Sequence, residues 1–291
     1  MKWFDYAAPD NLSEATLLLS SRPLARALAG GTDLLVQMRG GRLSPDLVVD
    51  LKHIPELNDL RVEPDGGLTL GAAVPCYRIY NDAEVSRCYP SLAEVASLIG
   101  GTQIQGRASI GGNLCNSAPS ADSVPLLIAL GATCRIAGPG GSRHIAVEDF
   151  CTAPGRNALQ SGELLVSLHL PAPGPGSGAR YLRFIPRNEM DIAVAGAGVS
   201  VVVEKGVLQS VRIALASVAP TPLFVRDAQT LAGQPAGEET FLSAASLARD
   251  AARPITDMRG TADYRRHLCG VLTRRALEVA VQRAMENGHH A

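Results

Sequence analysis

Two glycine-rich segments of this chain carry the residue types that bind an anionic ligand. The first reads Ala29-Gly30-Gly31-Thr32-Asp33 and the second reads Ser109-Ile110-Gly111-Gly112-Asn113. Each ends in small polar residues, and glycine leaves the backbone amides bare, so each is predicted to be a loop that can touch phosphate oxygens. Two such loops are suited to hold a diphosphate between them.

The residues around the first segment strengthen this interpretation, because glycine pairs alone also mark ordinary turns. The apolar run Leu24–Leu28 precedes it, and the run Leu34–Met38 that follows can open a helix with Thr32 or Asp33 as N-cap. A strand, a glycine turn and a helix start form an anion site, since free amides and the helix dipole point at the turn.

The second segment leads into residues 114–122, a small, polar stretch that ends in the carboxylate of Asp122. This stretch offers hydroxyls and amides to a ligand before the apolar, helix-like run Val124–Leu130. Neither glycine segment fits Gly-x-Gly-x-x-Gly after a strand or Gly-x-x-x-x-Gly-Lys-Ser/Thr, which disfavours a Rossmann fold and a P-loop. The phosphates must be bound in another way.

Composition excludes several other classes of protein. The chain has 27 basic and 28 acidic residues, so nothing favours binding to nucleic acid or to an anionic membrane. No apolar run approaches the roughly 18 residues of a membrane-spanning helix. The N-terminus lacks the apolar core of a signal peptide, which predicts a cytoplasmic protein.

No metal site is predicted on this chain. The six cysteines form no Cys-x-x-Cys pair, so neither a zinc site nor an iron–sulfur cluster is expected and the thiols are predicted to be free. His144, His169 and His267 have no histidine partner at i+4, and His289-His290 are interpreted as a frayed tail.

The elements that must position these segments form a mixed α+β pattern. A length of 291 residues predicts two or three compact units. Residues 171–178 are nearly all Pro, Gly and Ser and are predicted to be a linker or surface loop. The predicted helices cover 12–19, 92–99, 124–130, 244–252 and 264–285, and the predicted strands cover 47–51, 68–70, 133–137, 193–203 and 208–218.

The two glycine segments, with Leu114-Cys115-Asn116 and Ser120-Ala121-Asp122, resemble the flavin-binding medium subunit of the molybdenum hydroxylases. That family includes bacterial xanthine dehydrogenase, whose FAD-binding subunit fits the pattern best, and aerobic carbon monoxide dehydrogenase. The likeness runs from Phe4 to Leu268. Three further landmarks agree with it: Gly131-Ala132, Gly162-Glu163-Leu164-Leu165-Val166 and Met190-Asp191-Ile192-Ala193.

The resemblance implies a fold and a domain layout. Residues 1–175 would form a two-lobed FAD-binding domain of the vanillyl-alcohol-oxidase/PCMH type, with a small lobe at about 1–57 and a second at about 58–175. Residues 176–291 would form a C-terminal α+β domain of the carbon monoxide dehydrogenase flavoprotein type. FAD would lie extended between the two lobes.

The resemblance also implies a set of cofactor-binding residues and no catalytic residue. The first loop would give amides to the diphosphate, with a polar contact from Asp33, and the second loop would meet it from the other side. Asp122 would bind a sugar or ribityl hydroxyl, and Arg183 would take the place of a family lysine near the isoalloxazine. The full set is Leu28, Ala29, Gly30, Gly31, Thr32, Asp33, Leu34, Ile99, Gly100, Ser109, Ile110, Gly111, Gly112, Asn113, Asp122, Leu165 and Arg183.

Plainer roles remain open for three of these residues. Asp33 and Asp122 are also typical helix caps. Arg183 is also consistent with an exposed strand position, and arginine is not interchangeable with lysine. In residues 149–157, where many relatives carry an aromatic that screens the flavin, the only aromatic residue is Phe150, a pattern closer to the xanthine dehydrogenase type.

The function implied is electron transfer. A large partner chain would carry the molybdenum cofactor and hydroxylate the substrate, and a small partner chain would relay electrons through two [2Fe–2S] clusters. This chain would receive them on FAD and pass them to NAD⁺ or another acceptor, in a heterotrimer or a dimer of heterotrimers. The cofactor carries the chemistry, so no general acid or base is required here.

Two other classes remain as alternatives. A self-sufficient FAD-dependent oxidoreductase of the same fold would have its own substrate site. A non-enzymatic interaction or scaffold protein would use the glycine segments only as turns. Bound flavin separates the scaffold from the other two, and dependence on partner chains separates those two from each other.

Overall fold

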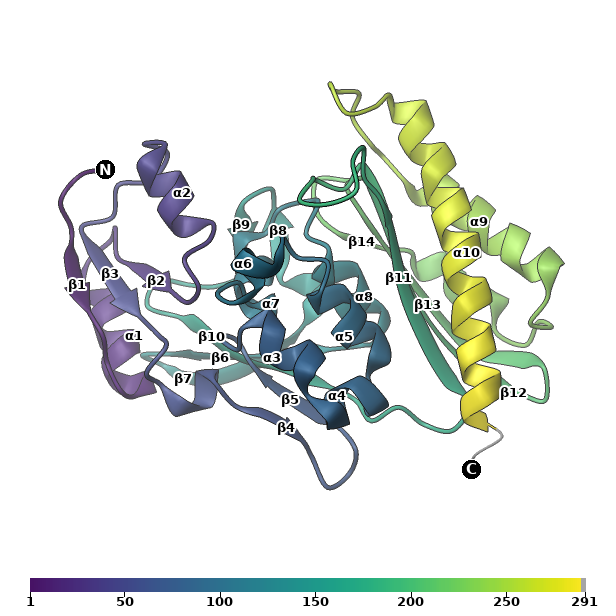
Figure 1. The fold of residues 1–291 in the computed structure, drawn as a ribbon, viewed down its shortest axis with the longest axis horizontal. Coiled ribbons are helices and arrows are strands. Elements are labelled where there is room, and N and C mark those ends of the chain that lie inside the picture. The colour runs from purple at the N-terminus through teal and green to yellow at the C-terminus, as the bar shows by residue number, and fades with distance from the viewer. Residues whose placement is uncertain (289–291) are drawn as a thin grey trace.

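The computed structural model describes residues 1–288, so the expectation for His289-His290 lies outside the described residues. Three main sheets follow one another from the N-terminus to the C-terminus, with the six short helices α3 to α8 between the second sheet and the third (Figure 1). Helices and strands alternate irregularly and the larger sheets are antiparallel, as the predicted α+β class requires.

The N-terminal part is a small parallel sheet with two helices. Its strands lie in the order β1-β3-β2, and the side chain of Asn11 caps the first helix by accepting a 2.9 Å hydrogen bond from the amide of Glu14. Val49 is fully buried beneath that helix. The elements are β1 (Asp5–Ala7), α1 (Leu12–Ser21), β2 (Arg26–Leu28), α2 (Leu34–Arg39) and β3 (Leu47–Asp50).

The middle part is an antiparallel sheet in the order β4-β5-β10-β6-β7, covered by the helices on one side (Figure 1). Its strands are β4 (Leu60–Val62), β5 (Leu68–Gly71), β6 (Thr133–Gly138), β7 (Gly141–Ala146) and β10 (Leu164–Leu170), with a separate hairpin of β8 (Cys151–Ala153) and β9 (Arg156–Asn157). Its helices are α3 (Cys76–Asn81), α4 (Ala83–Cys88), α5 (Pro90–Ala96), α6 (Thr102–Gln105), α7 (Ile110–Asn116) and α8 (Ser123–Ala129). Single 3-10 turns lie at Pro55–Leu57 and Val147–Asp149.

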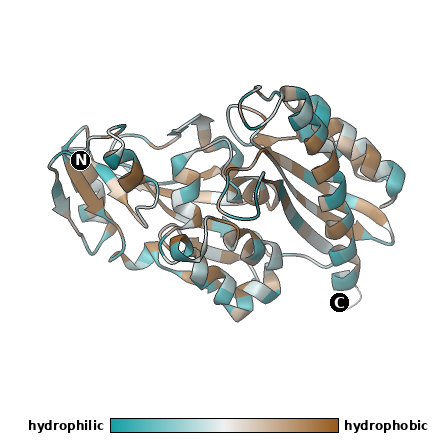
Figure 2. Cartoon of the chain, turned by 45° about the horizontal axis from the view of Figure 1, so that its top comes forward, coloured by the Kyte–Doolittle hydropathy of each residue, from teal (hydrophilic) through white to brown (hydrophobic). Residues whose placement is uncertain are grey.

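The C-terminal part is an antiparallel sheet backed by two longer helices. The strands β11 (Ser177–Phe184), β12 (Ala195–Glu204), β13 (Val207–Ala216) and β14 (Leu223–Phe224) lie in sequence order, followed by a 3-10 helix (Arg226–Leu231), α9 (Glu238–Ala251) and α10 (Ala262–Gly288). Hydrophobic and hydrophilic bands alternate along these two helices, as expected for helices with one buried face (Figure 2). Gly178 lets α10 lie directly on β11, because a Cβ there would overlap the Ala280 carbonyl oxygen.

Several local predictions need correction. The second glycine segment is not a loop throughout, because Ile110 begins α7 and the Ser109 hydroxyl caps that helix by accepting from the Gly112 amide at 3.0 Å. The helix predicted over 92–99 ends at Ala96. Asp33 and Asp122 occupy the N-cap positions of α2 and α8, but neither side chain makes a capping hydrogen bond.

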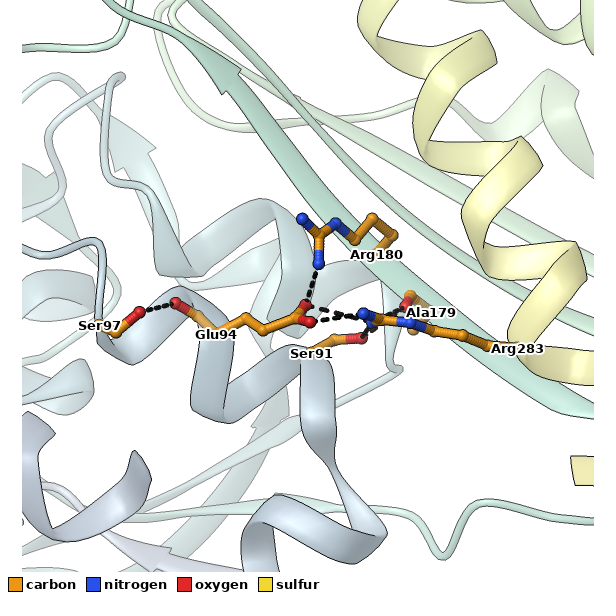
Figure 3. A network of polar contacts seen from close by, with 6 residues as sticks. All are labelled: Ser91, Glu94, Ser97, Ala179, Arg180 and Arg283. Carbon is orange, nitrogen blue, oxygen red and sulfur yellow. Dashed lines mark hydrogen bonds and ion pairs between the residues drawn. The ribbon is translucent and has the colours of Figure 1, made fainter. Parts of the chain in front are cut away.

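A polar cluster joins α5 to the C-terminal part (Figure 3). The carboxylate of Glu94 pairs with Arg180 of β11 at 2.6 Å and with Arg283 of α10. The Arg283 guanidinium also donates to the Ser91 hydroxyl and to the Ala179 carbonyl, both at 2.9 Å. This cluster fixes the C-terminal helix against the helix that leads toward Ile99.

We expect Arg283→Met to lower the free energy of unfolding by about 1–2 kcal/mol, because Glu94 and two further acceptors lose a partner in a half-exposed setting. Urea unfolding of both proteins measures this difference. Arg275→Met is the matched control, since Arg275 is exposed on the same helix. Equal midpoints for the two variants would contradict the role given to the cluster.

Candidate functional site

A cavity of about 630 Å³ lies where the N-terminal, middle and C-terminal parts meet. Its volume falls within the roughly 300–1,000 Å³ of small-molecule and cofactor sites. The wall includes both glycine segments, the start of β10, and the segment after β11. Residues far apart in the sequence therefore share one site.

The first glycine segment forms the turn between β2 and α2. No hydrogen bond within residues 1–288 uses the amides of residues 30–34, although these residues line the cavity. Gly31 has a φ of +80°, which favours glycine. Free amides carry a cost unless water or a ligand satisfies them, so this turn is suited to an anion.

The second glycine segment forms the start of α7 and lies against the first. A Cβ on Gly30 would overlap the Arg107 carbonyl oxygen, so the backbone that leads into the second segment packs directly on the first. Arg107 donates to the Gly30 carbonyl at 3.3 Å, and Gln37 donates to the Asn116 side chain at 3.1 Å. These contacts hold the two segments on either side of the cavity.

A buried ion pair forms the wall nearest the C-terminal part. Arg183 of β11 pairs with Asp122, and the two side chains are only 9% and 12% exposed. The Tyr181 hydroxyl donates to the other oxygen of the same carboxylate at 2.7 Å. Burial raises the pKa of Asp122, and the Arg183 charge and the Tyr181 hydrogen bond oppose that rise.

Asp33, in the first glycine segment, is another acidic residue that lines the cavity. Its side chain is open to the cavity, yet surrounding protein removes enough water to raise the pKa of its carboxyl. No cation pairs with it among the ion pairs of the described residues. Asp33 therefore offers an acceptor to a hydroxyl or amide of a ligand.

The structure brings together nearly all of the residues predicted for the site. Every one lines the cavity except Leu28 and Ile110, whose side chains are buried in hydrophobic clusters. The prediction missed Gln37, Asn116 and residues 190–192, which also line the wall. Asn116 and Met190-Asp191-Ile192 lie in motifs that carry the family resemblance, and that signal could have found them.

The segment 149–157 does not reach this cavity. Phe150 is fully buried in the hydrophobic core of the middle part, and Pro154 lines a neighbouring cavity. No aromatic side chain from 149–157 covers the predicted flavin position.

Arg187, outside the predicted set, donates to the Met190 carbonyl at 2.5 Å and supports the turn before β12.

A second cavity of about 420 Å³ adjoins the first and shares Ser120 and Ile192 with it. The residues that line it include Arg253, Arg259 and Arg265. Arg265 is buried and donates to Asp257 at 2.7 Å and to two backbone carbonyls. The surplus of cations over carboxylates suits this cavity to an anion.

Among residues 1–288 no group of three or more His, Cys, Asp or Glu side chains could hold a metal ion. All six cysteines are free, and burial raises the pKa of Cys115, which lines the first cavity, to about 12. A thiol with that pKa is a poor nucleophile and metal ligand. Over the same residues, none of the helices is both long and apolar enough to cross a membrane.

Comparison with known proteins identifies the family. A model described as the FAD binding domain in molybdopterin dehydrogenase matches residues 2–173. A model described as the CO dehydrogenase flavoprotein C-terminal domain matches residues 180–280.

Individual relatives match over nearly the whole chain. The xanthine dehydrogenase FAD-binding subunit of Escherichia coli O157:H7 is 32% identical, covering 97% of this chain and 98% of its own. The carbon monoxide dehydrogenase medium chain of Afipia carboxidovorans is 33% identical, covering 97% and 98%.

Solved structures agree. A chain of carbon monoxide dehydrogenase from Hydrogenophaga pseudoflava superposes with a TM-score of 0.93 at 33% identity, covering 97% of this chain and 98% of its own. A chain of quinoline 2-oxidoreductase from Pseudomonas putida 86 gives 0.91 at 31% identity, covering 98% and 100%. The fold is therefore the FAD-binding fold of the PCMH type with the family's C-terminal domain. This chain belongs to the FAD-binding medium subunits of the molybdenum hydroxylases, the family of xanthine and carbon monoxide dehydrogenases.

Proposed function

We propose that this chain is the electron-transfer subunit of a xanthine dehydrogenase-like molybdenum hydroxylase and binds FAD in the first cavity. When bound, FAD supplies the means to accept electrons from the [2Fe–2S] clusters of a partner chain and to pass them to NAD⁺ or another acceptor. The observation that carries the proposal is the run of unpartnered amides at 30–34 facing a cavity of cofactor size in a chain of this family.

The residues present fit FAD. The amides of 30–34 and the capped start of α7 at Ser109 offer donors to a diphosphate from two sides. The Asp122 carboxylate keeps lone pairs for a ribityl hydroxyl. Leu165 and Arg183 at the far wall provide an apolar contact and a cation for the ring system, and Ile99-Gly100 close one side.

We also propose the domain division 1–175 and 176–291, with lobes at about 1–57 and 58–175. The break between β10 at Leu170 and β11 at Ser177 supports the first boundary. The change from the parallel sheet to the antiparallel sheet between β3 and β4 supports the second.

The relatives are named as subunits, which supports partner chains for this protein as well. No group of three or more His, Cys, Asp or Glu side chains within residues 1–288 could hold a metal ion, and chemistry carried by FAD needs no general acid or base from the cavity residues. We propose a large chain with the molybdenum cofactor and a small chain with [2Fe–2S] clusters, in a heterotrimer or a dimer of heterotrimers in the cytoplasm. The names of the relatives, which are medium chains and FAD-binding subunits, support this assembly.

The visible spectrum of the purified full chain, with identification of any cofactor released on denaturation, tests the proposal. Noncovalent FAD without iron–sulfur absorbance is the expected result. A colourless chain that also fails to take up added FAD would contradict the proposed function. Reduction by a substrate in the absence of partner chains would instead favour the self-sufficient oxidoreductase.

For the acceptor we propose NAD⁺, with its phosphates in the second cavity. The three arginines among the residues that line this cavity are the supporting observation. We expect Arg259→Ala in the assembled enzyme to raise the KM for NAD⁺ roughly tenfold to a hundredfold, because a charged hydrogen bond contributes about 1.5–3 kcal/mol. Steady-state kinetics measure this effect, with a small uncharged dye as the control acceptor, whose rate should not change. An unaltered KM for NAD⁺ would argue for a different acceptor.

A further inference from the structure

Tyr181 is buried beside the cavity and has no role in the predicted site. Its side chain is only 4% exposed, and its hydroxyl donates to Asp122 Oδ1 at 2.7 Å while Arg183 pairs with Oδ2. Tyr181 and Arg183 are two residues apart on β11, so their side chains leave the same face of the strand. Each oxygen of the carboxylate therefore has its own donor.

The neighbouring strand is shaped to admit this hydroxyl. Gly196 of β12 lies opposite Arg183 in the sheet, and a Cβ there would overlap the Tyr181 hydroxyl oxygen. Gly198 lies opposite Tyr181, and a Cβ there would come within 2.7 Å of the Pro125 backbone in α8. These two glycines keep α8, which begins directly after Asp122, close to the tyrosine.

The contacts among Tyr181, Asp122 and Arg183 determine how strongly the positive charge of Arg183 acts in the cavity. Arg183 alone would present a full cation in a site poor in water, where charges act strongly. Asp122 compensates that charge only while its carboxylate stays ionised and turned toward the guanidinium. The Tyr181 hydroxyl favours both conditions, because a donor stabilises the ionised form and fixes its orientation.

We propose that Tyr181 is a positioning residue that holds the Asp122 carboxylate on Arg183 and thereby sets the charge that bound FAD experiences. This inference rests on the proposed FAD site. Without the hydroxyl, the carboxylate compensates the Arg183 charge less fully. Reduction adds negative charge to the cofactor, so a less compensated cation shifts its midpoint potential to a more positive value.

The test measures the midpoint potential of FAD bound to the full chain, together with its dissociation constant. We expect Tyr181→Phe to shift the potential in the positive direction, and Asp122→Asn to shift it further in the same direction. Because the tyrosine acts through the aspartate, the double variant should match Asp122→Asn alone. A merely structural role for Tyr181 would change stability and leave the potential where it was.

Tyr6→Phe is the matched control. Its hydroxyl donates to Asp50 at 2.6 Å beside Lys52, which is a second tyrosine–aspartate–cation cluster that does not line the cavity. Its removal should leave the potential unchanged. If Tyr181→Phe fails to fold, Gly196→Ala displaces the same hydroxyl with all three side chains retained, and the same positive shift is expected.

The outcomes separate this inference from the function on which it rests. An unchanged potential in a variant that has bound FAD overturns the role of Tyr181 and leaves the FAD site intact. Fully additive shifts in the double variant overturn it as well. A wild-type chain that takes up no FAD overturns the proposed function, and the inference fails with it.

Discussion

Gly30→Ala is expected to weaken FAD binding by about a hundredfold. A Cβ at this position would overlap the carbonyl oxygen of Arg107, which belongs to the backbone and cannot rotate away. The turn before α2 must therefore move relative to the start of α7. Overpacking of this kind costs about 1–3 kcal/mol, and here the displacement falls on the amides proposed to hold the diphosphate.

Titration of the apo chain with FAD, followed by fluorescence, measures this loss. Gly140→Ala is the matched control, since a Cβ there would meet no atom within 4 Å beyond its chain neighbours and its φ is not in the left-handed region. The control should bind FAD as the wild type does. Equal affinities for the two variants would show that the close approach of the two glycine segments is not needed for the cofactor.

Arg183→Met is expected to lower the free energy of unfolding by about 3–5 kcal/mol at neutral pH, because it leaves the buried Asp122 carboxylate without its cation. The loss should shrink in acid. Burial already raises the pKa of Asp122, and removing Arg183 raises it further. The folded variant then binds a proton that the unfolded chain releases above about pH 4, so its stability falls as pH rises through the folded pKa.

Urea unfolding of the wild type and the variant between acid and neutral pH measures this difference. Arg274→Met is the control, since Arg274 pairs with Glu238 in an exposed setting and should give a small, nearly pH-independent loss. If the gap between Arg183→Met and the wild type is the same at every pH, Asp122 is not the group left without its partner.

Local pattern was enough to predict much of this fold. The helices predicted over 12–19 and 264–285 and the strands predicted over 193–203 and 208–218 depend on residues close in sequence, and the structure contains an element of the predicted type over each range. The family motifs then predicted that both glycine segments contribute to one site, and both line the same cavity. The predicted length of α5 was wrong because Leu98 and Ile99 are apolar for a different reason, namely packing against the core of the middle part.

The remaining features depend on sheet register and could not be predicted from neighbouring residues. From the sequence, Asp122 and Arg183 are each predicted to contact a different part of the cofactor. Only the structure, with β11 paired to β12 beside α8, shows that the two side chains form an ion pair with each other. Tyr181 carries no motif at all. Its importance follows from Gly196 on another strand, a relation that composition and spacing do not encode.

The contact between Gly178 and α10 bears on how the protein is made. The cavity takes its first wall from residues near position 30 and its last from residues 183–192 on and after β11. That strand is packed under α10 and bonded by Arg283 of the same helix, which donates to the Ala179 carbonyl. A ribosome-bound chain that has emerged only as far as residue 261 has no α10 to cover β11, so this wall of the cavity is supported only after residues 262–288 have been made.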